Sequence, residues 1–174
     1  MAAATTLLTL DEYHRCYATE NGYEYWFGEA VRKSVPTLLH SILQIILGEF
    51  LYRMGYVSAS ELDLRIDPNW EPRPDVCAML TPQHPYPTRP VAVVAEILSP
   101  DDPMSKVFEK CRRYKHIGIG QIFVFDPEAH VGWEWSSATE NLERIHILEL
   151  GNGSKMDLAE VWNELAVRAT LQSS

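Results

Sequence analysis

A glutamate stands in one of the most apolar segments of this 174-residue sequence. Glu96 interrupts the run VAVVAEIL at residues 91–98, where its neighbours on both faces of a strand are apolar. Burying an ionised carboxylate costs several kcal/mol unless something positive meets it. One interpretation is a glutamate at the exposed end of a strand, hydrogen-bonded to the backbone. The functional interpretation is that a cation lies beside Glu96.

Asp75 is the expected partner of Glu96. It follows Pro74 at the start of a short strand predicted over residues 75–80, where a carboxylate can point toward the same end of the sheet. Two carboxylates from adjacent strands, with waters completing the coordination shell, suit a hard divalent cation. We therefore expect Asp75 and Glu96 to bind Mg²⁺ or Mn²⁺.

Lys110 is the third candidate, on a helix predicted over residues 103–116. The apolar stripe of this helix includes Val107, Cys111 and Tyr114, and the helical step puts Lys110 at the edge of that buried face. A lysine there can reach the end of the sheet. The alternative is a lysine whose stem covers the rim of the helix while its charge stays in water.

The elements that must position these residues follow from periodicity and from glycine and proline signals. Residues 91–98 are apolar on both faces and indicate a central buried strand. Residues 57–67 alternate between apolar and charged side chains, as in a half-buried strand. Helices are predicted at 11–18, 37–54, 103–116 and 157–169, and further strands at 23–26, 30–34, 75–80, 121–126, 131–135 and 142–150. The prediction is an α/β fold in which a mixed β-sheet is flanked by helices, as one domain over residues 1–174 with its core at about 11–167.

Composition narrows the class of protein. No apolar run is long enough to span a membrane, and the N-terminus lacks the basic segment of a signal peptide. Three cysteines without CxxC spacing favour reduced thiols, so we expect a cytoplasmic protein. The formal net charge is −9, which counts mildly against binding to nucleic acid by overall charge. The sequence has neither a GxSxG elbow nor a phosphate-binding P-loop.

The ordered set of these residues resembles the Uma-type restriction endonuclease family of the PD-(D/E)XK nuclease superfamily. The resemblance covers about residues 11–167. It is carried by Pro74-Asp75, Glu96-Ile97-Leu98-Ser99-Pro100, Lys110 with Tyr114, Asp126-Pro127, Tyr23-Glu24, Gly28-Glu29, His40 and Met156-Asp157-Leu158.

The resemblance implies a restriction-endonuclease-like fold and a Mg²⁺-dependent (or Mn²⁺-dependent) hydrolysis of phosphodiester bonds in DNA. By this resemblance, Asp75 occupies the position of the family's first metal-binding aspartate, and Glu96 occupies that of the second acidic ligand. The superfamily's lysine usually follows that acid by two residues, but Leu98 occupies the position here, and Lys110 matches the lysine that the Uma-type family carries on the next helix. Glu29 and His40 are expected near the site. For His40, packing at the start of a helix is the alternative.

The sequence departs from the family pattern at two positions. Lys106 replaces an acid common one turn before Lys110, and Phe27 replaces the acid usual just before the opening glycine.

DNA and a second copy of the chain are the expected partners. The helix at 103–116 carries a net charge of +4, so a phosphate backbone can lie beside it, and cutting two strands favours a homodimer. The alternative function is a non-catalytic module that binds nucleic acid or protein and keeps the nuclease fold. The acidic composition favours this alternative, and the retained Asp75, Glu96 and Lys110 favour the enzyme.

Overall fold

The computed structural model describes residues 7–20 and 22–170, and their centre is a six-stranded mixed sheet. Its strand order is β3–β5–β6–β7–β8–β9, and only β6 and β7 run parallel within it. The strands are β3 (Val57–Ser60), β5 (Val76–Met79), β6 (Val93–Ile97), β7 (Gln121–Asp126), β8 (Val131–Ser136) and β9 (Asn141–Ile145). The α/β class with a mixed sheet, predicted from the sequence, is confirmed.

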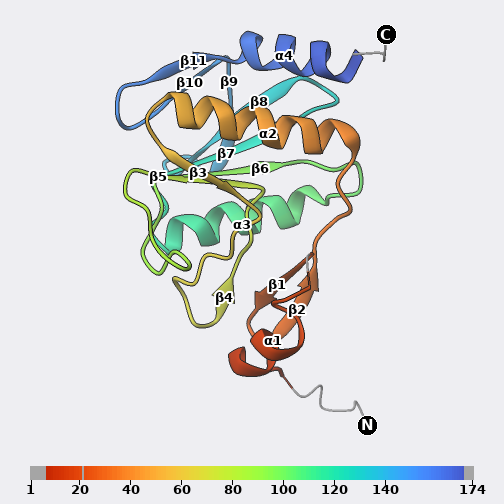
Figure 1. Cartoon of the computed structure of the whole chain (residues 1–174), viewed down its shortest axis with the longest axis vertical. Helices are drawn as coiled ribbons and strands as arrows, with labels where there is room; N and C mark the ends of the chain where they lie inside the picture. Colours follow the sequence, from red (N-terminus) through yellow and green to blue (C-terminus); the bar gives the residue numbers. More distant parts are fainter. Residues whose placement is uncertain (1–6, 21, 171–174) are drawn as a thin grey trace.

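Helices cover both faces of this sheet. α2 (Leu38–Arg53) and α4 (Leu158–Thr170) lie on one side, and α3 (Met104–His116) lies on the other (Figure 1). Alternate residues of the central strands therefore enter two separate cores: Ala95 packs with the α2–α4 side, and Val94 with the α3 side. None of the helices within 7–20 and 22–170 has both the length and the apolar character needed to cross a membrane.

The parallel pair β6–β7 explains where the middle of the chain goes. Parallel neighbours need a crossover, and α3 supplies it between the two strands. β6 is buried along its whole length. Because side chains alternate along a strand, Glu96 lies on the same face as Val94, which is the face that α3 covers. The strand that bears the candidate site is therefore packed from both sides.

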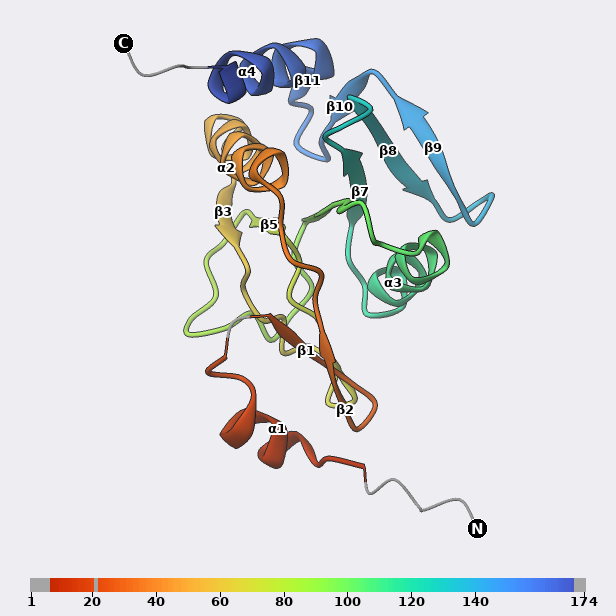
Figure 2. The ribbon, with the colours of Figure 1, turned by 90° about the vertical axis from the view of Figure 1, so that its right-hand side faces the viewer.

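Smaller elements surround this centre. The hairpin of β1 (Tyr23–Trp26) and β2 (Glu29–Arg32) joins β4 (Trp70–Glu71) in a three-stranded sheet. With α1 (Leu10–Cys16), the hairpin lies on the α3 side of the large sheet (Figure 2). A two-stranded sheet of β10 (Ile147–Glu149) and β11 (Lys155–Asp157) precedes α4.

Two predicted strands are longer than the observed ones. The prediction at 57–67 is wrong beyond Ser60, because Glu61 adopts a positive φ of 52° that turns the chain. Asp63, placed on the solvent face by the alternation, is buried and paired with Arg73 at 2.7 Å. The prediction at 142–150 is divided at His146, since β9 pairs with β8 and β10 pairs with β11. β4 and β11 have no counterpart among the predicted strands.

Gly120 and Gly48 provide a test of the packing. A Cβ at Gly120 would lie 2.8 Å from the backbone oxygen of Ala92, which also accepts the Gln121 N–H where β7 begins. We expect Gly120→Ala to lower the free energy of unfolding by about 1–3 kcal/mol. A Cβ at Gly48, inside α2, would meet only Ser58 Oγ at 3.8 Å, so Gly48→Ala should raise it by about 0.5–1 kcal/mol.

Urea unfolding of both variants measures the two effects. Equal stabilities of Gly120→Ala and the wild type would contradict the close approach of residue 120 to β6.

Candidate active site

A cavity of about 400 Å³ opens where the hairpin, the start of α2, the end of β6 and α3 meet. Charged side chains line its floor: Glu24, Asp75, Glu96 and Lys110 are buried, and Lys33 is partly buried. Its mouth is lined by apolar side chains such as Val35 and Leu98, and by Lys106. Charged groups from separate segments thus lie below a partly apolar entrance.

Asp75 and Glu96 come together through the register of β5 and β6. Val76 pairs with Ala95 in this antiparallel ladder, so one further step places Asp75 opposite Glu96. Asp75 Oδ2 accepts the backbone N–H of Ile97 at 2.7 Å, which fixes the carboxylate against β6. The register therefore brings the two acids onto neighbouring strands, opposite one another, and both line the cavity.

The electrostatic surroundings of Asp75 favour its charged form. Burial alone would raise the pKa of Asp75. The nearby charge of Lys33 and the hydrogen bond from His40 outweigh burial and hold the pKa well below its usual range. Asp75 is therefore an anion throughout the neutral pH range.

Glu96 has the opposite behaviour. Its Oε1 lies 2.8 Å from Lys110 Nζ and accepts the hydroxyl of Tyr114. Burial, together with the charges of Asp75 and Glu24, raises the pKa of Glu96 to about 7 although Lys110 opposes the shift. Within the described part of the chain no hydrogen bond reaches Oε2. One oxygen of Glu96 is thus held and the other is free for a further cation.

Lys110 is buried, as its place at the edge of the helix predicted, and it contacts two acids. Its Nζ lies 3.0 Å from Glu24 Oε1 as well as 2.8 Å from Glu96 Oε1. Burial disfavours the ammonium, but the charges of Glu24, Glu96 and Asp75 raise the pKa of Lys110. The lysine stays protonated and bridges the hairpin to the central strand.

Glu24 was not among the predicted site residues. It is 2% exposed, and its two oxygens accept the Arg73 N–H at 2.9 Å and the Trp26 indole N–H at 3.0 Å. The Lys110 and Arg73 contacts outweigh the effect of burial and lower the pKa of Glu24. The sequence marks Glu24 in the same way as Glu96, because each is a carboxylate within a strand of apolar or aromatic residues.

Lys33 was also missed, and it adds a second, partly buried cation. Lys33 Nζ lies 2.9 Å from Asp75 Oδ1, 2.8 Å from Glu61 Oε2 and 2.8 Å from the Arg73 carbonyl oxygen. It directly follows β2, in the connection to α2. No local pattern marks such a lysine, because its partners lie 28 to 42 residues away along the chain.

The two secondary candidates differ in outcome. His40 lines the cavity near the start of α2, with Nε2 3.4 Å from Asp75 Oδ1 and Nδ1 3.3 Å from Ser99 Oγ. His40 therefore packs at the start of α2 and also lies beside Asp75, so the two interpretations of this residue are compatible. Glu29 does not line the cavity: it is exposed at the turn end of the hairpin, opposite Trp26. The expectation for Glu29 is wrong because the open end of the hairpin, at Glu24 and Arg32, faces the site.

The donor set fits a divalent cation. Four carboxylates (Glu24, Glu61, Asp75 and Glu96) surround two ammonium groups (Lys33 and Lys110), which leaves two negative charges when histidine is counted as neutral. Among the described residues no three His, Cys, Asp or Glu side chains form a ready-made metal cage. Two carboxylates with waters are the arrangement in which Mg²⁺ is commonly held, and Asp75 and Glu96 provide them.

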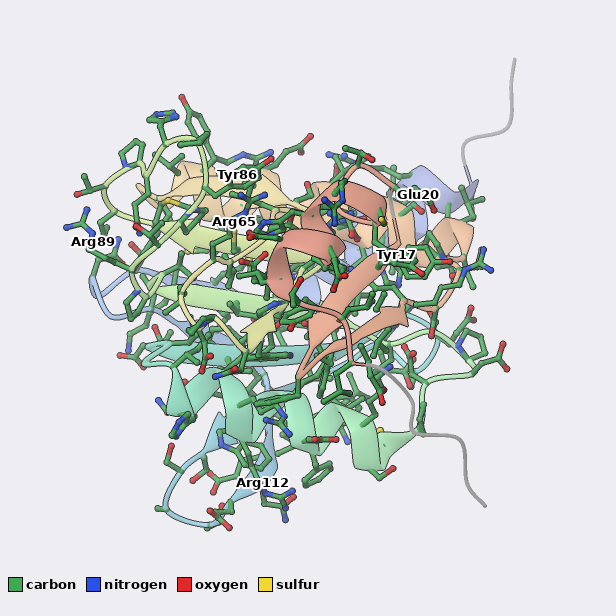
Figure 3. All side chains as sticks on the ribbon, turned by 90° about the horizontal axis from the view of Figure 1, so that it is seen from below. Tyr17, Glu20, Arg65, Tyr86, Arg89 and Arg112 are labelled. Atoms are coloured by element: carbon green, nitrogen blue, oxygen red, sulfur yellow. The ribbon has the colours of Figure 1, made fainter. Side chains whose placement is uncertain are left out.

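The basic helix offers fewer free cations than its composition suggested. Arg113 pairs with Glu109 at 2.7 Å, and Lys115 donates to the Gly120 carbonyl at 2.9 Å. Arg112 is exposed on α3 (Figure 3), and Lys106 lines the cavity mouth. In the same view Arg65 lies over the ring of Tyr86, 3.7 Å from its centroid. Lys106 is therefore the helix cation at the cavity mouth, whereas the Arg112 guanidinium lies over Trp135 of β8, 5.9 Å from the ring centroid.

Comparison with known proteins relates the chain to a family and to solved structures. The profile of the Uma2 family, described as "Putative restriction endonuclease", matches residues 10–168. The chain is similar to the crystal structure of a "putative nuclease belonging to DUF820" from Anabaena variabilis ATCC 29413, with a TM-score of 0.73, 17% identity, and coverage of 91% of this chain and 99% of that one. That likeness confirms the restriction-endonuclease-like fold expected from the sequence.

Other comparisons add little. A DrdV–DNA complex is similar over 71% of this chain and 10% of that one, at 12% identity and a TM-score of 0.39, which is too low to support a shared fold. No curated protein matches the chain.

The raised pKa of Glu96 predicts a pH dependence of stability. Between pH 4.5, its ordinary pKa, and about 7, the folded metal-free protein holds a proton that the unfolded chain releases. The contribution of Glu96 to stability is therefore highest at low pH and falls as the pH rises through this window. Glu96→Gln removes that slope. Relative to the wild type, the variant should gain about 1–3 kcal/mol of unfolding free energy between about pH 5 and pH 8.

Urea melts at the two pH values measure this difference. Glu128→Gln, at an exposed turn, is the matched control and should follow the wild type. If the free energies of unfolding of Glu96→Gln and the wild type changed with pH in parallel, the raised pKa of Glu96 would be contradicted.

Proposed function

Because this chain belongs to the Uma2 restriction endonuclease family, we propose that it is a metal-dependent endonuclease that hydrolyses phosphodiester bonds in DNA. The observation that carries the proposal is the convergence of Asp75, Glu96 and Lys110 on the floor of one cavity. The two carboxylates provide the ligands, and the lysine provides a positive charge beside them.

Asp75 and Glu96 are the residues that would hold Mg²⁺ or Mn²⁺. Such an ion supplies a Lewis acid for the scissile phosphate and lowers the pKa of a bound water. Asp75 is suited to the role because it is an anion fixed to β6 by the Ile97 N–H. Glu96 is suited because Tyr114 and Lys110 hold Oε1 and leave Oε2 toward the cavity.

Lys110 acts on the phosphate. An ammonium group carries three N–H donors, and two of its contacts are with Glu24 and Glu96. A third donor remains to stabilise the negative charge that develops on the phosphate oxygens. Glu24 is a positioning residue, since it holds the ammonium from the hairpin side.

DNA would approach over the cavity mouth, where Lys106 lies. The homodimer and the cytoplasmic location remain predictions from the sequence.

Metal binding is the first test. Titration with Mn²⁺ or Mg²⁺ should stabilise the wild type by RT ln(1 + [L]/Kd), which is about 2.7 kcal/mol at a hundredfold excess over Kd. Glu96→Gln and Asp75→Asn should lose this gain and remain folded without metal. Thermal melts at several metal concentrations provide the measurement, with Glu128→Gln as the control. A full metal-induced shift in both site variants would refute the ligand assignment.

Cleavage by lysine variants separates an enzyme from a binding module. Lys110→Met keeps the stem of the side chain and removes the charge, so turnover on plasmid or oligonucleotide DNA should fall by about 10²–10³ with binding little changed. Lys106→Met, at the mouth of the same cavity, should weaken binding and reduce the salt dependence by about one charge.

Lys110→Met leaves two buried carboxylates without their cation, so the double variant Lys110→Met/Glu24→Gln keeps the charge balance and serves as the folded comparison. DNA binding without cleavage by the metal-loaded wild type would favour the non-catalytic module. If Lys110→Met and Lys106→Met changed cleavage and binding by small and equal amounts, Lys110 would have no specific role in the cleavage step.

A further inference from the structure

Lys33 provides a second cation at the proposed metal ligands, and its bonding differs from that of Lys110. Its Nζ donates to Asp75 Oδ1 at 2.9 Å, to Glu61 at 2.8 Å and to the Arg73 carbonyl oxygen at 2.8 Å. These three directions use all the donors of an ammonium group. Lys33 thus has none left for a substrate phosphate, whereas Lys110 has one.

The position of Lys33 puts it in competition with a metal. Both oxygens of Asp75 already have partners: Oδ2 accepts the Ile97 N–H, and Oδ1 is the oxygen that cationic side chains approach. Lys33 binds that oxygen, and His40 Nε2 faces it at 3.4 Å. A divalent ion that coordinates Oδ1 must share or displace the Lys33 ammonium.

The backbone around Lys33 allows such a displacement. Lys33 lies outside regular structure, between the end of β2 at Arg32 and the start of α2 at Leu38. The Lys33 backbone N–H is bonded to the Gly22 carbonyl oxygen at 2.7 Å, and the Ser34 hydroxyl bonds to Asp102. The chain is anchored on both sides of the residue, and the side chain can leave Asp75 without unfolding a helix or a strand.

We propose that Lys33 is a built-in counter-ion that competes with the divalent cation for Asp75 and thereby sets the metal affinity of the site. This inference rests on the proposed metal-dependent function and adds a residue that controls it. In the metal-free protein the Lys33 ammonium lies between Asp75 and Glu61 and offsets one of their two negative charges. When metal binds, the ammonium moves away from Oδ1 and becomes accessible at the cavity.

Charge predicts the direction of the effect. Removing Lys33 changes the excess of the cluster from two negative charges to three. A unit charge within a few ångströms of a partly buried site alters the affinity of a divalent ion by at least about tenfold. Lys33→Met should therefore bind Mn²⁺ at least about tenfold more tightly than the wild type.

The experiment measures Mn²⁺ binding by calorimetry for the wild type, Lys33→Met and Lys106→Met. Lys106 is the matched control, because it lines the same cavity and makes no ion pair with any described residue. Its removal changes the net charge equally, yet should alter the Mn²⁺ affinity by less than about threefold because its charge lies at the exposed mouth.

A second readout uses the wild-type protein alone. Reductive dimethylation followed by mass spectrometry should label Lys33 faster with Mn²⁺ than without it, and labelling of Lys155, on β11, should not change. This measurement decides the question even if Lys33→Met does not fold.

Each outcome has a separate meaning. Tighter binding by Lys33→Met, or metal-dependent labelling of Lys33, supports the competition. Wild-type binding of Mn²⁺ with equal or weaker binding by Lys33→Met, and unchanged labelling, overturns it while leaving the metal site intact. Absence of Mn²⁺ binding in all three proteins overturns the proposed metal dependence and this inference together.

Discussion

The Lys110 ammonium between Glu24 and Glu96 is the interaction on which the arrangement of this protein depends. It joins the N-terminal hairpin to the central strand through contacts of 3.0 and 2.8 Å. All three groups are buried, so each would be costly without the others; breaking one such pair leaves an uncompensated charge and costs about 3–5 kcal/mol. The hairpin is therefore held on the sheet by the same charges that form the candidate site.

The topology of the sheet makes this concentration of charge possible. β6 is central and covered on both faces, so an acid on it is removed from water, and its parallel partner β7 requires the crossover that delivers α3 and Lys110. Neighbouring acids then differ in protonation. Lys33 and His40 favour the charged form of Asp75, whereas burial raises the pKa of Glu96 to about 7. One carboxylate is a permanent anion, and the other is ready to respond to a cation.

Several basic side chains form ion pairs within the protein, and this affects how an acidic chain could bind DNA. The net charge is −9, and several basic side chains near the site are engaged in internal contacts. A phosphate backbone would then be attracted chiefly by local charges at the cavity mouth and by a metal ion, since overall charge repels it. Under the proposed function, metal affinity and DNA binding would be coupled, and the proposed role of Lys33 would affect both.

The sequence by itself determined the α/β class and the central residues of the site. Glu96, Asp75 and Lys110 were predictable because a charged residue inside an apolar strand or at the edge of an apolar helix stripe is a local pattern. Glu24 shows the same pattern in β1, but only the tertiary structure decided that it belongs to the site, together with Lys33 and Glu61, and that Glu29 does not. Both ends of the hairpin carry an acid, and which end faces β6 depends on docking between distant segments. The strand predicted at 57–67 failed past Ser60 because the chain turns at Glu61, and Asp63 is then buried in an ion pair with Arg73, which the alternation does not record. Local periodicity records which face of an element is apolar, whereas ion pairs between segments are fixed only when the chain has folded.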